Sequence, residues 1–195
     1  MTTWITTNWF ELTAALITAW SIWLATREHI GYYPTGLVAL AMYTRLFYEA
    51  KLYAESVLQI VCFALMVYGW YEWLHGGANR EELPVTRTPR WAWLAGVVSG
   101  IIGSALVIAF QLRFTDNPNP YVDSSLLVWS LVAQWMTARK WIENWIVWVI
   151  INTISIPLYV TRSYWITAVL YAVLWILAID GYFKWRRTLV PSASA

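Results

Sequence analysis

The chain has 195 residues, of which 59% are hydrophobic and only 12% are charged, against about a quarter charged in soluble domains. This composition excludes an ordinary soluble domain and indicates an integral membrane protein. The formal net charge of +2 is too small and too scattered to favour a nucleic-acid-binding protein.

Apolar stretches follow one another along the whole chain, each close to the length that about 30 Å of hydrocarbon requires in a helix. The second stretch carries Arg45 and Glu49 near its end, and the fifth is short. No basic region precedes the first stretch and Glu11 interrupts it, so we expect no cleavable signal and a first span that stays. The sequence therefore predicts an all-α protein with seven spans at residues 8–26, 30–48, 53–74, 91–112, 123–138, 142–160 and 163–183.

Basic residues are distributed unevenly between the two sides of such a bundle. Four lie on the side reached by the connections after the second, fourth and sixth spans, whereas nine lie on the opposite side. By the positive-inside rule, the N-terminus is predicted outside and the C-terminus in the cytoplasm. The nine are Arg27, Arg80, Arg87, Arg90, Arg139, Lys140, Lys184, Arg186 and Arg187.

An internal repeat relates the first three spans to the last three. The third span ends "YGWYEW" and the seventh "DGYFKW", which align at an offset of 112 residues that also superposes Arg27 on Arg139. The two sets enter the membrane in the same sense, which predicts a 3+1+3 arrangement of parallel repeats with the substrate site between them, near the midplane. The predicted parts are a first repeat at 8–74, a connecting segment at 75–122, a second repeat at 123–185 and a cytoplasmic tail at 186–195.

The connection "HGGANREELPVTRTPR" at 75–90 is polar and punctuated by glycine and proline, which is typical of a solvated loop. Both histidines, His29 and His75, lie in connections, and the sequence contains no zinc-type cluster or phosphate-binding loop. The single cysteine, Cys62, is interpreted as a packing thiol inside the third span. We therefore expect neither an enzyme nor a bound cofactor or metal.

Ion-coupled transport usually needs an ionisable residue deep in the membrane. The acidic candidates, Glu49, Glu55, Glu72 and Asp180, each lie near a span end, and Asp180 has Lys184 one turn away. Interfacial charge pairing is the simpler interpretation, so the sequence favours a passive facilitator while leaving coupling open.

One polar and aromatic face stands out in the sixth span, "WIENWIVWVIINTISIPLY". Trp145, Trp148 and Asn152 share this face at spacings of three and four, and an amide in hydrocarbon needs a hydrogen-bond partner. Indole faces and amides suit a flat heteroaromatic solute, with Gln59 and its repeat equivalent Tyr171 as further candidates. The alternatives are helix packing or an interfacial belt for the tryptophans, and interhelical hydrogen bonds for Gln59 and Tyr171.

Several segments together resemble the PnuC family of vitamin transporters, over essentially all seven spans. They are "YGWYEWL", "RKWIENWIVWVIIN" with its WxxWxxxN pattern, "ISIPLY" and "TAVLYAVLWILAIDGYFKW". The resemblance implies a fold similar to SWEET sugar transporters, facilitated diffusion of nicotinamide riboside, and a homotrimer in the bacterial inner membrane. It also implies that a cytoplasmic kinase retains the substrate without necessarily contacting the carrier, and that Trp145, Trp148 and Asn152 bind the substrate.

Relatives with a similar signature carry thiamine or riboflavin, and some have an acidic residue at the position of Asn152. Thiamine and riboflavin are therefore alternative substrates. A non-transporting membrane receptor or scaffold, with the aromatic face used for packing, is the alternative from a different class.

Overall fold

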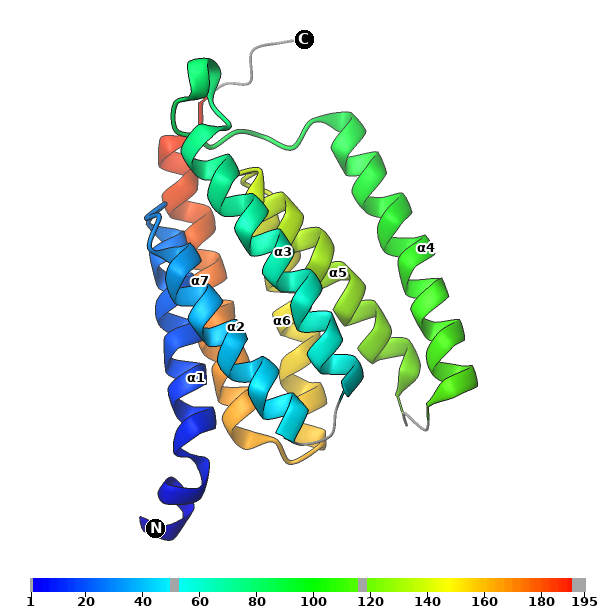
Figure 1. Cartoon of the computed structure of the whole chain (residues 1–195). Helices are drawn as coiled ribbons and strands as arrows, with labels where there is room; N and C mark the ends of the chain where they lie inside the picture. The colour runs from blue at the N-terminus through cyan, green and yellow to red at the C-terminus, as the bar shows by residue number, and fades with distance from the viewer. Residues whose placement is uncertain (1, 50–52, 116–118, 191–195) are drawn as a thin grey trace.

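The computed structural model describes residues 2–49, 53–115 and 119–190, which form seven α-helices and one short 3₁₀ helix. The helices lie side by side as a bundle, with α4 at its edge (Figure 1). Their bounds are α1 Thr2–Thr26, α2 Tyr32–Glu49, α3 Tyr53–His75, α4 Arg90–Phe114, α5 Pro120–Ala138, α6 Asn144–Thr161 and α7 Trp165–Thr188, with η1 at Ala78–Arg80. Each predicted span overlaps one of these α-helices.

The offset of 112 residues recurs in the helix boundaries. α1 and α5 end at equivalent positions, α2 and α6 begin and end at equivalent positions, and α3 and α7 begin at equivalent positions. The turns after α1 and α5 also match, because Glu28 and Lys140 both have left-handed backbones, with φ of 55° and 49°. Their N–H groups donate to Ala25 and Thr137 respectively, each at 3.0 Å. We refer to α1–α3 and α5–α7 as the two helix triplets.

Contacts between the triplets are also paired. α1 packs on α7 and α3 packs on α5, which are equivalent pairs at the same offset. The connections α1–α2, α3–α4 and α5–α6 all lie at the end of the bundle where α7 ends (Figure 1). This end carries the nine basic residues of the predicted cytoplasmic side, and we call it the basic end.

Helix α4 packs mainly on α5 through a stripe of small residues, namely Ala92, Gly96, Gly100 and Ser104. Most of its large apolar side chains point away from the bundle, including Leu94, Ile101 and Leu106. An apolar surface of this extent is stable next to hydrocarbon but not next to water.

Three of the described helices, α4, α6 and α7, are long and apolar enough to cross a membrane. The other helices carry more polar side chains, some of which face inward, such as Gln134 of α5 in the cavity described below. Inward-facing polar groups lower the mean hydropathy of a span without exposing a polar atom to lipid.

The connection before α4 differs from the solvated loop predicted from its composition. Residues 78–82 are exposed, but the following segment packs against the basic end, where Val85 is 1% exposed. Leu83 N–H donates to the Trp73 carbonyl at 3.1 Å, and the Val85 carbonyl accepts the N–H of Val190 at 3.0 Å. The prediction was wrong here because polar composition does not reveal that one valine fills a gap between helix ends and the tail.

Candidate functional site

A cavity of about 230 Å³ lies between the two triplets and is lined by α1, α2, α3, α5 and α6. Typical small-molecule pockets measure roughly 300–1,000 Å³, so this cavity suits one small solute and would widen for a large one. Among the described residues that line it, none is an acid, a histidine or a charged base. Its polar groups are hydroxyls, one amide, one thiol and one indole.

The threonine and serine hydroxyl groups of the cavity wall are already bonded to backbone carbonyls. Thr18 Oγ1 donates to the Ala14 carbonyl at 2.8 Å, and Ser130 Oγ donates to the Leu126 carbonyl at 2.7 Å. Each hydroxyl oxygen keeps lone pairs that can accept a hydrogen bond from a solute. Thr18 and Ser130 are equivalent at the offset of 112, so both triplets contribute such an acceptor.

A hydrogen-bonded trio links the triplets across the cavity. Gln134 Nε2 of α5 donates to Tyr32 Oη at 3.0 Å and to Met66 Sδ at 3.0 Å. Tyr32 Oη in turn donates to Gln134 Oε1 at 3.2 Å. The sequence analysis missed Gln134 and Tyr32, although an amide within an apolar run was the signal that singled out Asn152.

Trp148 is the residue of the predicted site that lines this cavity. Its ring is half-buried, and its Nε1–H donates to Thr137 Oγ1 at 3.3 Å. Part of the indole therefore faces the cavity, while its N–H group is held by α5.

Trp145 lies three residues earlier but has different surroundings. It is 2% exposed, meets Trp185 edge to face at 5.3 Å, and lies against Gly181, where an added Cβ would come within 2.6 Å of the ring. The equivalent group in the first triplet is Tyr33, which meets Trp73 edge to face at 5.1 Å. Trp145 is not among the residues that line the cavity. The same edge-to-face ring pair occurs in both triplets, which indicates that Trp145 serves helix packing.

The other three predicted residues also lie outside the described cavity lining. Asn152 is 2% exposed, one turn beyond Trp148 on α6, and its Oδ1 has no hydrogen-bond partner among the described residues. Tyr171 of α7 packs its ring against Tyr159 at 5.0 Å. Gln59 of α3 is half-buried. A buried polar atom without a partner is costly, and Asn152 Oδ1 and Trp145 Nε1 are the two such atoms of the predicted site among the described residues.

The basic end of the bundle is closed by an ion pair between the two equivalent turns. Lys140 is 4% exposed; its Nζ lies 3.6 Å from Glu28 Oε2 and 4.6 Å from the centre of the Trp73 ring. Burial lowers the pKa of Lys140 from its ordinary value, and the carboxylates of Glu28 and Glu82 oppose this shift. The carboxylates therefore offset the burial of the ammonium group only in part.

Two tryptophans also join the triplets at the basic end, because each donates a hydrogen bond to a helix end of the other triplet. Trp73 Nε1–H of α3 donates to the Thr137 carbonyl at the end of α5, and Trp185 Nε1–H of α7 donates to the Ala25 carbonyl at the end of α1, each at 3.0 Å. Both donors and both acceptors are equivalent at the offset of 112. Each triplet thus binds the end of the other.

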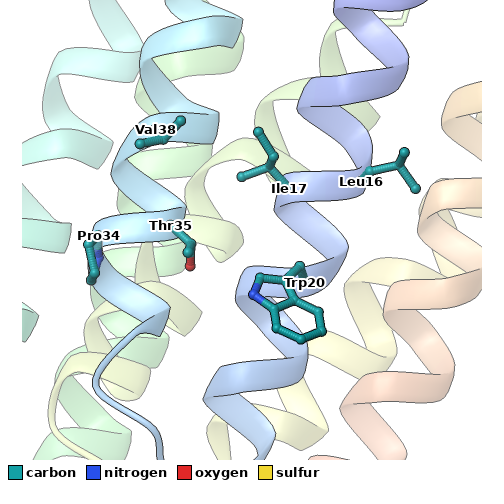
Figure 2. A pocket seen from close by; sticks show the side chains of 6 residues that line it. All are labelled: Leu16, Ile17, Trp20, Pro34, Thr35 and Val38. Atoms are coloured by element: carbon teal, nitrogen blue, oxygen red, sulfur yellow. The ribbon is translucent and has the colours of Figure 1, made fainter.

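A second hollow of about 630 Å³ lies outside the bundle, between α1 and α2. Figure 2 shows its side chains, among which Leu16, Trp20 and Val38 are more than half exposed. Its one polar side chain, Thr35, donates to the Gly31 carbonyl at 2.6 Å. An open apolar groove of this kind matches lipid tails rather than a polar solute, so it is not the candidate site.

The apolar-sided helix bundle and the cavity between its two triplets are typical of a multi-pass membrane transporter. The family model for the nicotinamide mononucleotide transporter matches residues 8–187. The chain therefore belongs to this family, which includes the PnuC proteins.

Known proteins similar to this chain are transporters. The chain is 28% identical over 203 residues to the nicotinamide riboside transporter PnuC of Escherichia coli K12, covering 91% of this chain and 85% of that protein. It is 23% identical over 182 residues to the riboflavin/roseoflavin transporter RibM of Streptomyces davaonensis, covering 91% and 84%. A crystal structure of the vitamin B3 transporter PnuC matches with a TM-score of 0.74 at 22% identity, covering 93% of this chain and 82% of that chain, which shows a shared fold.

Proposed function

We propose that this protein carries nicotinamide riboside across the bacterial inner membrane by facilitated diffusion and so supplies a precursor of NAD. The observation that carries the proposal is the cavity between the triplets, where the Trp148 indole and the Gln134 amide line the same space. A pyridinium ring stacks on an indole face and gains further from the ring quadrupole, while amide and hydroxyl groups pair with polar side chains. The family membership and the nicotinamide riboside transporters among the relatives support the same substrate.

The proposed architecture is a 3+1+3 arrangement similar to SWEET transporters, in which all seven helices cross the membrane. It is supported by helix boundaries and tryptophan contacts that repeat at the offset of 112. The excess of lysine and arginine at the basic end supports a cytoplasmic C-terminus and an external N-terminus.

Within the cavity, we propose that Trp148 and Asn152 contact the substrate. Trp148 offers a ring face, and the unpaired Oδ1 of Asn152 can accept a hydrogen bond once the cavity widens around a ligand. Trp145 supports the α6–α7 wall behind them through Trp185 and Gly181. Gln59 and Tyr171 stay predictions, with no described contact to the cavity in their favour.

Passive transport is supported by the chemistry of the cavity wall, because no described lining residue is an acid or a histidine that could bind a coupling proton or cation. Downhill flux is therefore expected in both directions and should be unaffected when proton and sodium gradients are collapsed. Flux that requires an imposed ion gradient would contradict this part of the proposal.

Riboflavin is a second candidate because one relative, RibM, is named for it. The fused three-ring system of riboflavin is larger than a pyridine ring, and the cavity of about 230 Å³ favours the smaller solute. Thiamine, which is also cationic and heteroaromatic, is the third candidate substrate. A receptor or scaffold would bind such solutes without moving them.

The proposed assembly is a homotrimer in the lipid bilayer, with a cytoplasmic kinase that traps the substrate without contacting the carrier. Both features rest on the family resemblance.

Uptake by proteoliposomes, with nicotinamide riboside, thiamine and riboflavin compared, tests the function directly. Cys62 is the single cysteine of the chain and lines the cavity, so it supplies an internal reporter. A bound solute should slow its reaction with a thiol reagent, and the solute that protects Cys62 should also be transported. Binding and protection without uptake would favour a receptor, and the absence of binding by all three would refute the proposal.

A further inference from the structure

Gln134 is the most polar side chain in the cavity wall, and it has hydrogen-bonding capacity to spare. A primary amide has two N–H donors and an oxygen with two lone pairs. Its bonds are to one tyrosine hydroxyl and to the sulfur of Met66, which is a weak acceptor. One donor is therefore poorly satisfied, and the oxygen keeps a free lone pair.

The amide and the indole of the cavity wall are not repeated in the first triplet. The residue equivalent to Gln134 in the first triplet is Ile22, which also lines the cavity. The residue equivalent to Trp148 is Gly36, which offers no ring. The amide and the indole thus both come from the second triplet, on the neighbouring helices α5 and α6.

Tyr32 gives the amide a fixed orientation. Its ring is held by Trp73 at 5.8 Å and by Tyr33 at 4.7 Å, and its hydroxyl bonds both polar atoms of the Gln134 side chain. An amide with a fixed orientation binds a ligand more tightly than a mobile one, because less rotational freedom is lost on binding.

We propose that Gln134 binds the primary carboxamide of the ligand and thereby determines its specificity. This inference rests on the proposed function. The free lone pair of the Gln134 oxygen accepts one carboxamide N–H, while the bonds to Tyr32 are kept. A ligand with a carboxylate in the same place offers no donor to the Gln134 oxygen and repels it, so it is rejected.

The test is a comparison of dissociation constants for nicotinamide riboside and nicotinic acid riboside, which differ only in carboxamide against carboxylate. Calorimetry on the purified wild-type protein should show preference for the carboxamide. Gln134→Leu should weaken nicotinamide riboside binding roughly threefold to tenfold, as expected for one lost hydrogen bond, and should reduce the ratio between the two ligands. The matched control is Gln111→Leu on α4, outside the cavity lining, which should keep both constants and their ratio.

A hydrogen bond that serves only helix packing would act differently, lowering the melting temperature of Gln134→Leu and leaving the ligand ratio unchanged. That unchanged ratio would overturn the inference while the proposed function stands. If Gln134→Leu does not fold, Tyr32→Phe replaces it. Loss of the hydroxyl that orients Gln134 should also reduce the ratio of the two dissociation constants. An unchanged ratio in Tyr32→Phe would likewise overturn the inference. A wild-type protein that binds neither riboside would instead refute the proposed function, and with it this role of Gln134.

Discussion

At the scale of single residues, the two tryptophans of the WxxWxxxN pattern differ in what surrounds them. Trp148 lines the cavity, whereas Trp145 is enclosed by Trp185 and Gly181. Three positions on a helix differ by about 300° of rotation, so neighbouring side chains on one face still point 60° apart. That difference is enough to direct one ring to the cavity and the other to α7.

Truncating these rings should therefore separate binding from stability. Trp148→Ala should weaken ligand binding by about 1–3 kcal/mol, by analogy with bases stacked on aromatic side chains. Trp145→Ala should lower the free energy of unfolding by about 3–5 kcal/mol, as for other buried aromatic side chains, with affinity of the folded fraction nearly kept. Affinity and melting temperature are measured on the same samples. Trp20→Ala in the outer groove is the control, and an equal loss of affinity in both variants would contradict this division.

Two glycines of α4 provide a second residue-scale comparison. A Cβ on Gly100 would lie 2.8 Å from Cζ2 of Trp129, whereas a Cβ on Gly96 would lie 3.4 Å from Val132. Gly100→Ala should therefore cost about 1–3 kcal/mol through overpacking. Gly96→Ala should be neutral or stabilising, because alanine favours a helix by about 1 kcal/mol over glycine. Thermal unfolding of both variants in detergent checks this, and equal melting temperatures would show that the α4–α5 contact adjusts freely.

At the scale of helices and turns, the closure of the basic end depends on groups that are equivalent in the two triplets. Glu28 pairs with Lys140, and Trp73 and Trp185 exchange hydrogen bonds with the opposite helix ends. Any path from the cavity through this end requires these contacts to separate. We therefore expect these contacts to act as a gate, on the cytoplasmic side in the proposed orientation.

Breaking the ion pair should open this end. Lys140→Met leaves Glu28 without its partner, and an unpaired charge at a partly buried site is destabilising. We expect faster labelling of Cys62 by an impermeant thiol reagent applied at the basic end in inverted vesicles. The charge exchange Glu28→Lys with Lys140→Glu should restore slow labelling. Unchanged rates in Lys140→Met would show that the ion pair does not hold the gate closed.

At the scale of the whole molecule, basic residues gather at one end and apolar side chains cover the outer face of α4. The first feature predicts which end faces the cytoplasm, and the second predicts contact with lipid or with another copy. The two termini of the described chain lie at opposite ends of the bundle, as an odd number of spans requires (Figure 1).

The orientation can be measured with engineered cysteines in a Cys62→Ala background. A cysteine at Asn119, beside the N-terminus of α5, should react with an impermeant reagent from outside intact cells. A cysteine at Asn79, in the exposed part of the α3–α4 connection, should react only after permeabilisation. The opposite pattern would invert the proposed topology.

The sequence by itself determined the helical elements and their repetition. A hydrocarbon environment requires long apolar helices, so the apolar stretches predicted all seven α-helices of the described residues, with the largest differences at the start of α1 and the end of α7. It also determined Trp148 as a cavity residue, because a deep indole on a polar face is unusual in a span.

Only the tertiary structure decided what each side chain of that face meets. Spacing places Trp145, Trp148 and Asn152 together on α6, but the position of α7 encloses Trp145, and the position of α5 brings Gln134 to the cavity. The closure by Glu28 and Lys140 also emerged only from packing, since these residues lie 112 positions apart in two short turns. Local sequence sets helix type and face, whereas contacts between helices depend on how the triplets pack, and that is a property of the whole chain.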